Sequence, residues 1–234
     1  MKIDIITIFP DIFNSFFSES LLARAIKKKL ISIKAHNLRK WTNDNHKTVD
    51  DRPYGGGAGM LLKIEPIFRA VKSLSSYKVR QVKTRVILLS AKGKQFTQKD
   101  ARRLSKYSQL IFICGRYEGV DERVAKYVAD EEISVGPFVL FGGEVPVMTI
   151  IEAVSRLVPG VVAKEESIKN ESFSDKQGVE KEYPQYTRPE IFRMKIRNSK
   201  FEIRNSRRGW HVPKILLSGD HKKITSWREK QKKN

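Results

Sequence analysis

The fold class is clearest in residues 109–128, QLIFICGRYEGVDERVAKYV, which hold three kinds of segment in a row. Gln109 to Cys114 is a short run that is apolar on both faces, as in a strand buried inside a parallel sheet. GRYEG, residues 115–119, follows as a glycine-bearing loop. Asp121 to Val128 then has the spacing of a helix. A strand, a loop and a helix in this order predict an α/β protein.

The same alternation continues on both sides of this stretch. Ile3 to Phe9 precedes a helical stretch over 11–29 and a further strand over 31–37, and Arg85 to Ser90 precedes a helix that begins near Thr97. Thr97 can cap that helix, with an acid three residues later. A short strand near Ile133 and a helix over 147–157 complete the pattern. We predict a mainly parallel sheet with helices on both faces, with ligands at the carboxyl ends of its strands.

Two more glycine-bearing segments carry fixed charges, as GRYEGVDER does. They are DRPYGGGAGM, from Asp51 to Met60, and SVGPFVLFGGEVP, from Ser134 to Pro146. Glycine lets the main chain approach a ligand closely or adopt positive φ, so three such segments indicate a binding site. Tight turns or helix packing are the alternative. Neither a G-x-G-x-x-G fingerprint after the first strand nor a Walker A loop is present.

The composition favours a polyanionic partner. The 46 Lys and Arg against 26 Asp and Glu give a net charge of +20, and such an excess favours nucleic acid, although a solubilising surface is the plain alternative. The segment from Phe192 to Asn234 alone carries +11. No apolar run is long enough to cross a membrane, and the N-terminus does not read as a signal peptide. We therefore expect a cytoplasmic protein without a membrane partner.

The metal-ligating residue types are few and scattered. Cys114 is the only cysteine, and the four histidines lie far apart without ligand-like spacing. No structural zinc is expected. Because Cys114 ends an apolar run, a buried inert thiol is a better interpretation than a nucleophile.

Composition divides the chain into three parts. Residues 1–160 form the sheet domain, residues 161–186 lose periodicity and read as a flexible linker, and residues 187–234 form a small basic helical domain. Within the last part IRNS occurs twice, at Ile196 and Ile203, which indicates a local duplication or an insertion, and the family resemblance described below places an insertion over 194–207. A helix over 222–232 is predicted near the end.

Six ordered segments resemble one known family. They are FPDIF at 9–13, TVDDRPYGGGAGM at 48–60, CGRYEGVDERV at 114–124, VSRLVPGV at 154–161, YPQYTRPE at 183–190 and VPKILLSGDH at 212–221. Together they resemble the bacterial tRNA (guanine-N1)-methyltransferases of the knotted, SPOUT-type class. This resemblance implies methyl transfer from S-adenosyl-L-methionine to N1 of the guanosine immediately 3′ of the anticodon of tRNA. It also implies a homodimer whose active site lies at the subunit interface.

The resemblance further implies a deep trefoil knot in the carboxyl half of the sheet domain, whose loops form the S-adenosyl-L-methionine pocket. Knots are rare exceptions to the ordinary connection rules. The residues that would line the pocket are Leu89, Ser90, Ala91, Gly115, Tyr117, Glu118, Val135, Gly136, Pro137, Phe138, Val139, Leu140, Gly142, Gly143 and Pro146.

The reaction needs a base for the N1 proton and a cation for the charge that gathers on O6. By resemblance the cation is Arg156 and the base is Glu171, at a position where the family has Asp. Asp175 is a second candidate for the base. The alternatives are a helix-face salt bridge for Arg156 and a solvated linker charge for Glu171.

The resemblance also assigns residues around the glycine loops. Glu118 would position the methionine end of the donor or a Mg²⁺ ion, with a surface ion pair as the alternative. Asp50, Arg52 and Gly59 would bind the target guanosine or its phosphate. For Asp50 the alternative is a turn aspartate whose hydrogen bonds are satisfied locally.

Two pocket positions depart from the family pattern. Pro137 stands where the family has an acid or polar residue, and Phe141 stands where it has serine. Together with Glu171 these departures keep open a basic RNA-binding protein of the same fold with impaired catalysis. A related enzyme, a knotted methyltransferase that acts on ribosomal RNA, is a second alternative.

Overall fold

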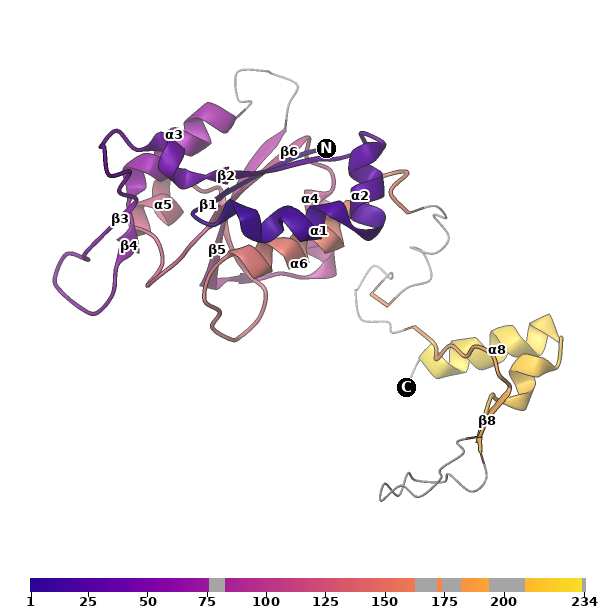
Figure 1. Cartoon of the computed structure of the whole chain (residues 1–234). Coiled ribbons are helices and arrows are strands. Elements are labelled where there is room, and N and C mark those ends of the chain that lie inside the picture. Colours follow the sequence, from indigo (N-terminus) through magenta and orange to yellow (C-terminus); the bar gives the residue numbers. More distant parts are fainter. Residues whose placement is uncertain (76–82, 163–171, 174–181, 194–208, 233–234) are drawn as a thin grey trace. The chain divides into compact units, whose positions relative to one another are not determined.

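The structure is a computed structural model that describes residues 1–75, 83–162, 172–173, 182–193 and 209–232 (Figure 1). The chain divides into two compact units, Met1–Glu165 and Glu166–Asn234. We refer to them as unit 1 and unit 2. The predicted insertion at 194–207 lies outside the described residues, as does most of the predicted linker.

Unit 1 is built on a five-stranded sheet with the order β2-β1-β6-β5-β7, in which every neighbouring pair is parallel. The prediction of a mainly parallel sheet is confirmed. β1 and β6 lie inside the sheet, and all six residues of β6 are buried, as the apolar run predicted. The strands are β1 (Lys2–Thr7), β2 (Ser32–Asn37), β5 (Thr84–Gln95), β6 (Gln109–Cys114) and β7 (Glu131–Ser134).

Helices cover both faces of this sheet (Figure 1). On one face α1, α2, α4 and α6 pack over alternate strand residues such as Ile5, Ile87 and Phe112. On the other face α3 and α5 pack over the intervening residues, such as Ile6 and Ile111. The helices are α1 (Asn14–Ser18), α2 (Ser20–Lys27), α3 (Ile64–Leu74), α4 (Gln98–Leu104), α5 (Glu122–Tyr127) and α6 (Glu144–Ser155).

The single helical stretch predicted over 11–29 is interrupted. A 3-10 helix at Pro10–Phe13 leads into α1, and the chain is extended at Glu19 before α2 begins with Ser20 at φ 61°. A non-glycine residue at positive φ departs from helical geometry. Periodicity alone does not show such a break because apolar spacing continues across it. α6 likewise begins three residues before the predicted start, since Pro146 is tolerated in a first helical turn.

Unit 2 is small and has its own short elements. β8 (Ile191–Phe192) and β9 (Trp210–His211) pair antiparallel, and the Phe192 and Trp210 rings lie 5.5 Å apart between centroids. A 3-10 helix, Lys214–Leu217, precedes α8 (His221–Lys232), close to the predicted span of 222–232. Across the described residues of the whole chain, no helix has the length and apolar character needed to cross a bilayer.

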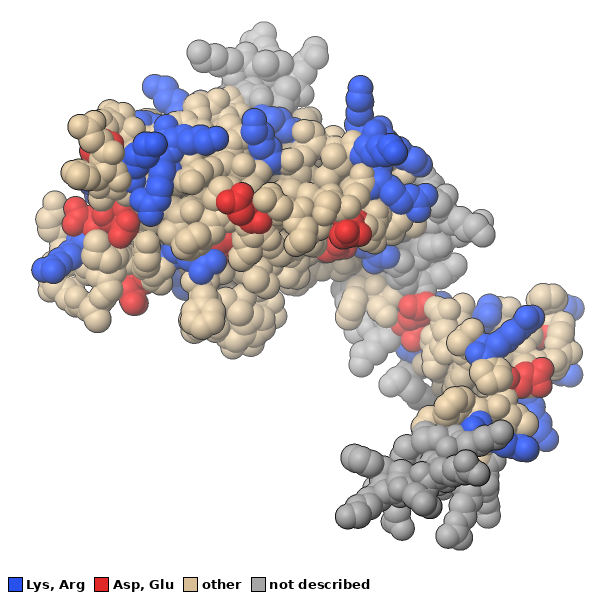
Figure 2. Space-filling view, viewed as in Figure 1, with Lys and Arg blue, Asp and Glu red and all other residues tan. Residues whose placement is uncertain are grey.

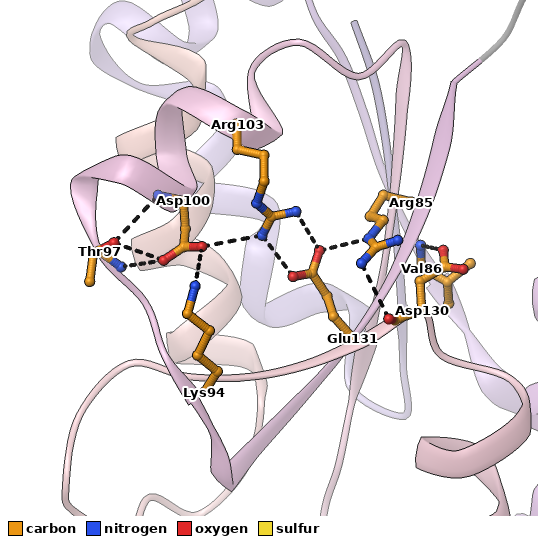
Figure 3. A network of polar contacts seen from close by, with 8 residues as sticks. All are labelled: Arg85, Val86, Lys94, Thr97, Asp100, Arg103, Asp130 and Glu131. Atoms are coloured by element: carbon orange, nitrogen blue, oxygen red, sulfur yellow. Dashed lines mark hydrogen bonds and ion pairs between the residues drawn. The ribbon is translucent and has the colours of Figure 1, made fainter. Parts of the chain in front are cut away.

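A polar network joins α4 to the neighbouring strands β5 and β7 (Figure 3). Thr97 and Asp100 form the predicted capping box at the start of α4. The carboxylate of Asp100 also accepts hydrogen bonds from Lys94 and Arg103. Arg103 in turn donates to both oxygens of Glu131, at 3.0 and 2.7 Å, and Arg85 donates to Glu131 at 2.8 Å. Glu131 of β7 is therefore held by two guanidinium groups.

This network predicts acid-dependent stability. Burial favours a higher pKa for Glu131, but the hydrogen bonds from Arg103 and Arg85 outweigh it and lower the pKa below the ordinary value of 4.5. The stabilisation is present above pH 4.5 and is lost as the pH falls through the lowered folded-state pKa. Glu131→Gln should lower the free energy of unfolding by on the order of 2 kcal/mol at pH 7. It should also weaken the fall of that free energy below pH 4.5. Urea unfolding between pH 2 and 7, with exposed Glu152→Gln as control, measures this. A Glu131→Gln variant whose stability falls with acid as steeply as that of the wild-type protein would contradict this role of Glu131.

Candidate functional site

A cavity of about 420 Å³ opens at the carboxyl ends of β5, β6 and β7. This is the edge at which the parallel sheet was expected to bind ligands. The structure places thirteen of the fifteen predicted pocket residues in its wall. They are Leu89, Ser90, Ala91, Gly115, Tyr117, Glu118, Val135, Phe138, Val139, Leu140, Gly142, Gly143 and Pro146.

The two remaining predicted residues do not line the cavity. Gly136 is buried beneath the ring of Phe138, since a Cβ at Gly136 would lie 2.2 Å from that ring. Pro137 is exposed in the following turn. Two positions depart from the family pattern. Pro137 lies outside the cavity wall, whereas Phe141 is part of it.

The loop after β6 and the loop before α6 meet at the cavity. The Gly143 amide donates to the Gly115 carbonyl at 3.0 Å. Gly143 packs so tightly that an added Cβ would lie 2.7 Å from the Cα of Cys114 and 3.1 Å from the Cβ of Leu89. The start of α6 is thereby seated against the ends of β5 and β6. Glycine is needed here for close approach of main chain to main chain.

A buried ion pair fixes the same two loops. Glu144, the first residue of α6, is 1% exposed; its Oε1 accepts from the Thr7 hydroxyl at 2.6 Å and its Oε2 from Arg116 Nε at 2.9 Å. The Arg116 guanidinium also lies 4.8 Å from the centroid of the Phe9 ring. A buried carboxylate needs such partners. Sequence reasoning noted Arg116 and Glu144 as fixed charges without a role; here they join the GRYEG loop to the FGGEVP loop.

The DRPYGGGAGM segment reaches this region as the turn of a hairpin between β3 (Asp50–Asp51) and β4 (Leu61–Leu62). The Glu118 amide donates to the Met60 carbonyl at 3.1 Å. At Gly59 an added Cβ would lie 2.5 Å from the Glu118 side chain, and φ is +84°. Two predicted segments that are distant in sequence are therefore brought together, with Gly59 against the cavity wall.

The other two predicted substrate residues lie in the same hairpin. Asp50 is half-buried in β3 and pairs with Leu62. Arg52 is exposed, and its main-chain N–H donates to the Asp51 carboxylate at 2.8 Å. What they bind stays a prediction.

Tyr117 and Glu118 form an exposed corner of the cavity. Tyr117 has φ 61°, a strained value for a bulky residue that occurs mostly in special turns, and its side chain is half-exposed. Glu118 forms no ion pair with any residue that the structure describes, so the surface ion pair has no support within that part of the chain. No group of three or more His, Cys, Asp and Glu placed to hold a metal ion occurs among the described residues.

The predicted catalytic pair is only half described. Arg156 directly follows the last residue of α6 and is half-buried. Glu171 and its alternative Asp175 both lie outside the described residues. Their roles stay predictions.

Cys114 is buried beneath the loop that begins α6. Burial raises the pKa of its thiol well above the ordinary value, and Glu144 adds to this effect while Arg116 opposes it. A thiol held in this way is neutral and unreactive. The prediction of a buried cysteine is confirmed.

The cavity wall also contains residues that the sequence did not indicate. Two of them, Leu88 and Glu132, are neighbours on β5 and β7. Strand alternation could have placed both on one face, but only once the pairing of these strands was known. The full set is Leu88, Lys92, Ala125, Glu132 and Ile133. The wall also includes Arg116, Gly119, Val120, Glu122, Ser134 and Phe141, which belong to two of the glycine-bearing segments that the sequence indicated.

The parallel sheet and the glycine-walled cavity at its carboxyl edge define an α/β protein with a small-molecule site. The whole chain, residues 1–234, matches the family tRNA (Guanine-1)-methyltransferase TrmD, and it belongs to that family.

Relatives named tRNA (guanine-N(1)-)-methyltransferase are similar to the chain over nearly its whole length. The protein of Dictyoglomus turgidum is 50% identical over 99% of this chain and 84% of its own length. The proteins of Carboxydothermus hydrogenoformans and Dehalococcoides mccartyi are 48% and 47% identical over 99% of this chain, and 82% and 85% of their own lengths.

Proposed function

We propose that this protein transfers a methyl group from S-adenosyl-L-methionine to N1 of the guanosine immediately 3′ of the anticodon in tRNA. The observation that carries the proposal is the cavity at the ends of β5, β6 and β7, walled by glycine loops that match the family's segments. The relatives' names supply the reaction and the class of RNA.

The residues present fit the donor. A cavity of about 420 Å³ falls in the range of sites for small molecules. Leu89, Val135, Leu140 and Pro146 supply apolar surface for a flat base, and the glycine loops expose main-chain donors and acceptors. When bound, the donor supplies an electrophilic methyl group on a sulfonium.

The trefoil knot of the family is part of the proposal. Its support is the place of Gly143, which packs between Leu89 of β5 and Cys114 of β6. A chain segment seated between the ends of two neighbouring strands is what a knot that builds a pocket requires. The resemblance to the family implies this knotted topology, which is rare among other folds.

The proposed chemistry on guanine uses two side chains. Glu171 removes the N1 proton, and Arg156 stabilises the negative charge that develops on O6. We propose that the site lies at the subunit interface of a homodimer, where the sheet domain of one subunit holds the donor and the linker, with Glu171, and small domain of the other subunit complete the site. Glu118 holds the amino-acid end of the donor or a Mg²⁺ ion.

The proposed RNA contacts follow from charge and position. Asp50, Arg52 and Gly59 hold the guanosine, because their hairpin lies against the cavity wall at Glu118. Residues 187–234 bind the tRNA body as a small basic domain, and residues 161–186 are the linker to it. The net charge of +20 supports this, and Figure 2 shows Lys and Arg side chains distributed over the visible face of both units. A cytoplasmic location stays a prediction.

Methyl transfer from labelled S-adenosyl-L-methionine to unmodified tRNA tests the proposal. We expect transfer to a transcript with guanosine 3′ of the anticodon and none to a transcript with adenosine there. Ribosomal RNA serves as the competing substrate. Transfer to ribosomal RNA alone would favour the knotted ribosomal RNA enzyme. Tight tRNA binding without transfer would favour the RNA-binding protein with impaired catalysis.

A further inference from the structure

We infer that Glu132 holds the methyl donor, its carboxylate accepting a hydrogen bond from an N–H or O–H group of the bound S-adenosyl compound. The inference rests on the proposed function and adds to it a residue that the family resemblance did not assign.

Glu132 is placed in the cavity by strand alternation. It lies on β7 opposite Leu88 of β5, and both line the cavity. Its neighbour Glu131 points to the other face of the sheet, where Arg85 and Arg103 neutralise it. Successive side chains of a strand point to opposite faces. The two adjacent acids thus differ: one is paired in the structural network and the other faces the cavity.

One oxygen of Glu132 is buried without a partner. Its Oε1 is inaccessible to solvent, and no donor among the described residues is within hydrogen-bonding distance. A buried acceptor without a donor is unfavourable, more so for a charged group. Most buried polar atoms in folded proteins are satisfied, so an exception calls for an explanation. A carboxylate without a donor in the wall of a cavity is explained by a ligand that supplies the donor once the side chain turns towards it.

A neighbouring cation, Lys92, does not pair with this carboxylate. Lys92 also lines the cavity, but its ammonium group donates to Glu122 on the exposed rim. The pKa of Lys92 is raised mainly by that hydrogen bond, which outweighs the opposing effect of burial, and the charge of Glu132 adds to it. Lys92 therefore lies near Glu132 without bonding to it, and the carboxylate has no cationic partner among the described residues.

The main chain at Glu132 is held by close packing. Gly93 of β5 lies so near that an added Cβ would be 2.7 Å from the Glu132 carbonyl carbon and 2.6 Å from the Ile133 nitrogen. The backbone that carries the carboxylate cannot shift towards β5. The backbone that carries the carboxylate is thus fixed before any ligand arrives, which lowers the entropic cost of binding.

The ligand chemistry follows from the acceptor. An ionised carboxylate only accepts hydrogen bonds. An S-adenosyl compound offers three donors to it: the adenine amine, the ribose hydroxyls and the ammonium of the amino-acid end. Carboxylates recognise ribose hydroxyls in other parallel α/β folds. The first two donors belong to the adenosine half and the third does not, so a truncated ligand separates them.

Calorimetry on the full chain tests the inference, with S-adenosylhomocysteine and 5′-methylthioadenosine as ligands. Glu132→Gln and Glu132→Ala should raise the Kd of S-adenosylhomocysteine by on the order of 10- to 100-fold, the loss of one charge-assisted hydrogen bond. The Tm without ligand should stay equal or rise, because an unsatisfied buried charge is removed. An equal loss for methylthioadenosine assigns the contact to the adenosine half, and a loss with S-adenosylhomocysteine alone assigns it to the ammonium.

Glu152→Gln is the matched comparison, since it removes the same charge from an exposed side chain of α6 that lies outside the cavity wall. Its effect on the Kd should stay below about threefold, because an exposed charge outside the cavity makes no contact with the ligand. The inference is overturned by an unchanged Kd in both Glu132 variants, by an equal loss in Glu152→Gln, or by a lowered Tm in both Glu132 variants. Failure of the wild-type protein to bind S-adenosylhomocysteine would overturn the proposed function as well.

Discussion

Arg156→Ala should lower kcat for methyl transfer to tRNA by about 100- to 1,000-fold, the usual loss when a group that stabilises developing charge is removed. Because Arg156 follows α6 and lies outside the described cavity wall, the Kd of S-adenosylhomocysteine should change by less than about threefold. Arg156→Lys should restore only part of the activity, since an ammonium keeps the charge without the planar fork of a guanidinium. Single-turnover kinetics with saturating tRNA measure the chemical step.

Two controls separate catalysis from folding. Arg69→Ala removes an arginine from α3, whose guanidinium bonds the Trp41 carbonyl, and should leave kcat unchanged. Thermal unfolding of Arg156→Ala should match the wild-type protein within about 2 °C. A kcat within tenfold of wild type would contradict the role of Arg156, and a large fall in Tm would assign it a structural role.

Gly143→Ala should both destabilise unit 1 and abolish donor binding. The added methyl would lie 2.7 Å from Cys114 Cα, an atom of a buried strand that cannot yield. Overpacking of this kind costs roughly 1–3 kcal/mol or more, which for a domain of this size lowers Tm by several degrees. Because Gly143 also joins Gly115 across the cavity, displacing it opens the site. Thermal unfolding and calorimetry with S-adenosylhomocysteine measure the two effects.

Gly115→Ala is the size-matched control for the stability effect. An added Cβ there meets its nearest atoms, the Leu89 carbonyl oxygen and Val120 Cγ1, at 3.7 Å, an ordinary van der Waals distance. Its Tm should therefore fall by less than about 2 °C. Equal Tm values for Gly143→Ala and wild type would mean that the loop before α6 does not rest on Cys114.

The sequence could predict features that depend on residues close to one another along the chain. The apolar run of β6, the capping box at Thr97 and the glycine loops after the strands were all readable, because side-chain alternation and capping are local effects. Thirteen of the fifteen residues predicted for the pocket line one cavity. The family resemblance supplied these positions, since local pattern alone left tight turns and helix packing open.

What the sequence could not predict depends on contacts between distant residues. The packing of Gly59 on Glu118 and the pairing of Leu88 with Glu132 require knowledge of which strands and loops are neighbours. The break at Glu19 and Ser20 is hidden by an apolar spacing that continues across it.

The strand order has a consequence for how the chain acquires its structure. β1 is the first strand to leave the ribosome, yet one of its two partners, β6, begins only at Gln109. Its other partner, β2, follows after a short helical connection. Pairings between residues so far apart in sequence must overcome loop-closure entropy before they gain contacts, and folding slows accordingly. Unit 1 should therefore mature late in synthesis, with an apolar β1 edge exposed to chaperones until β6 has been made.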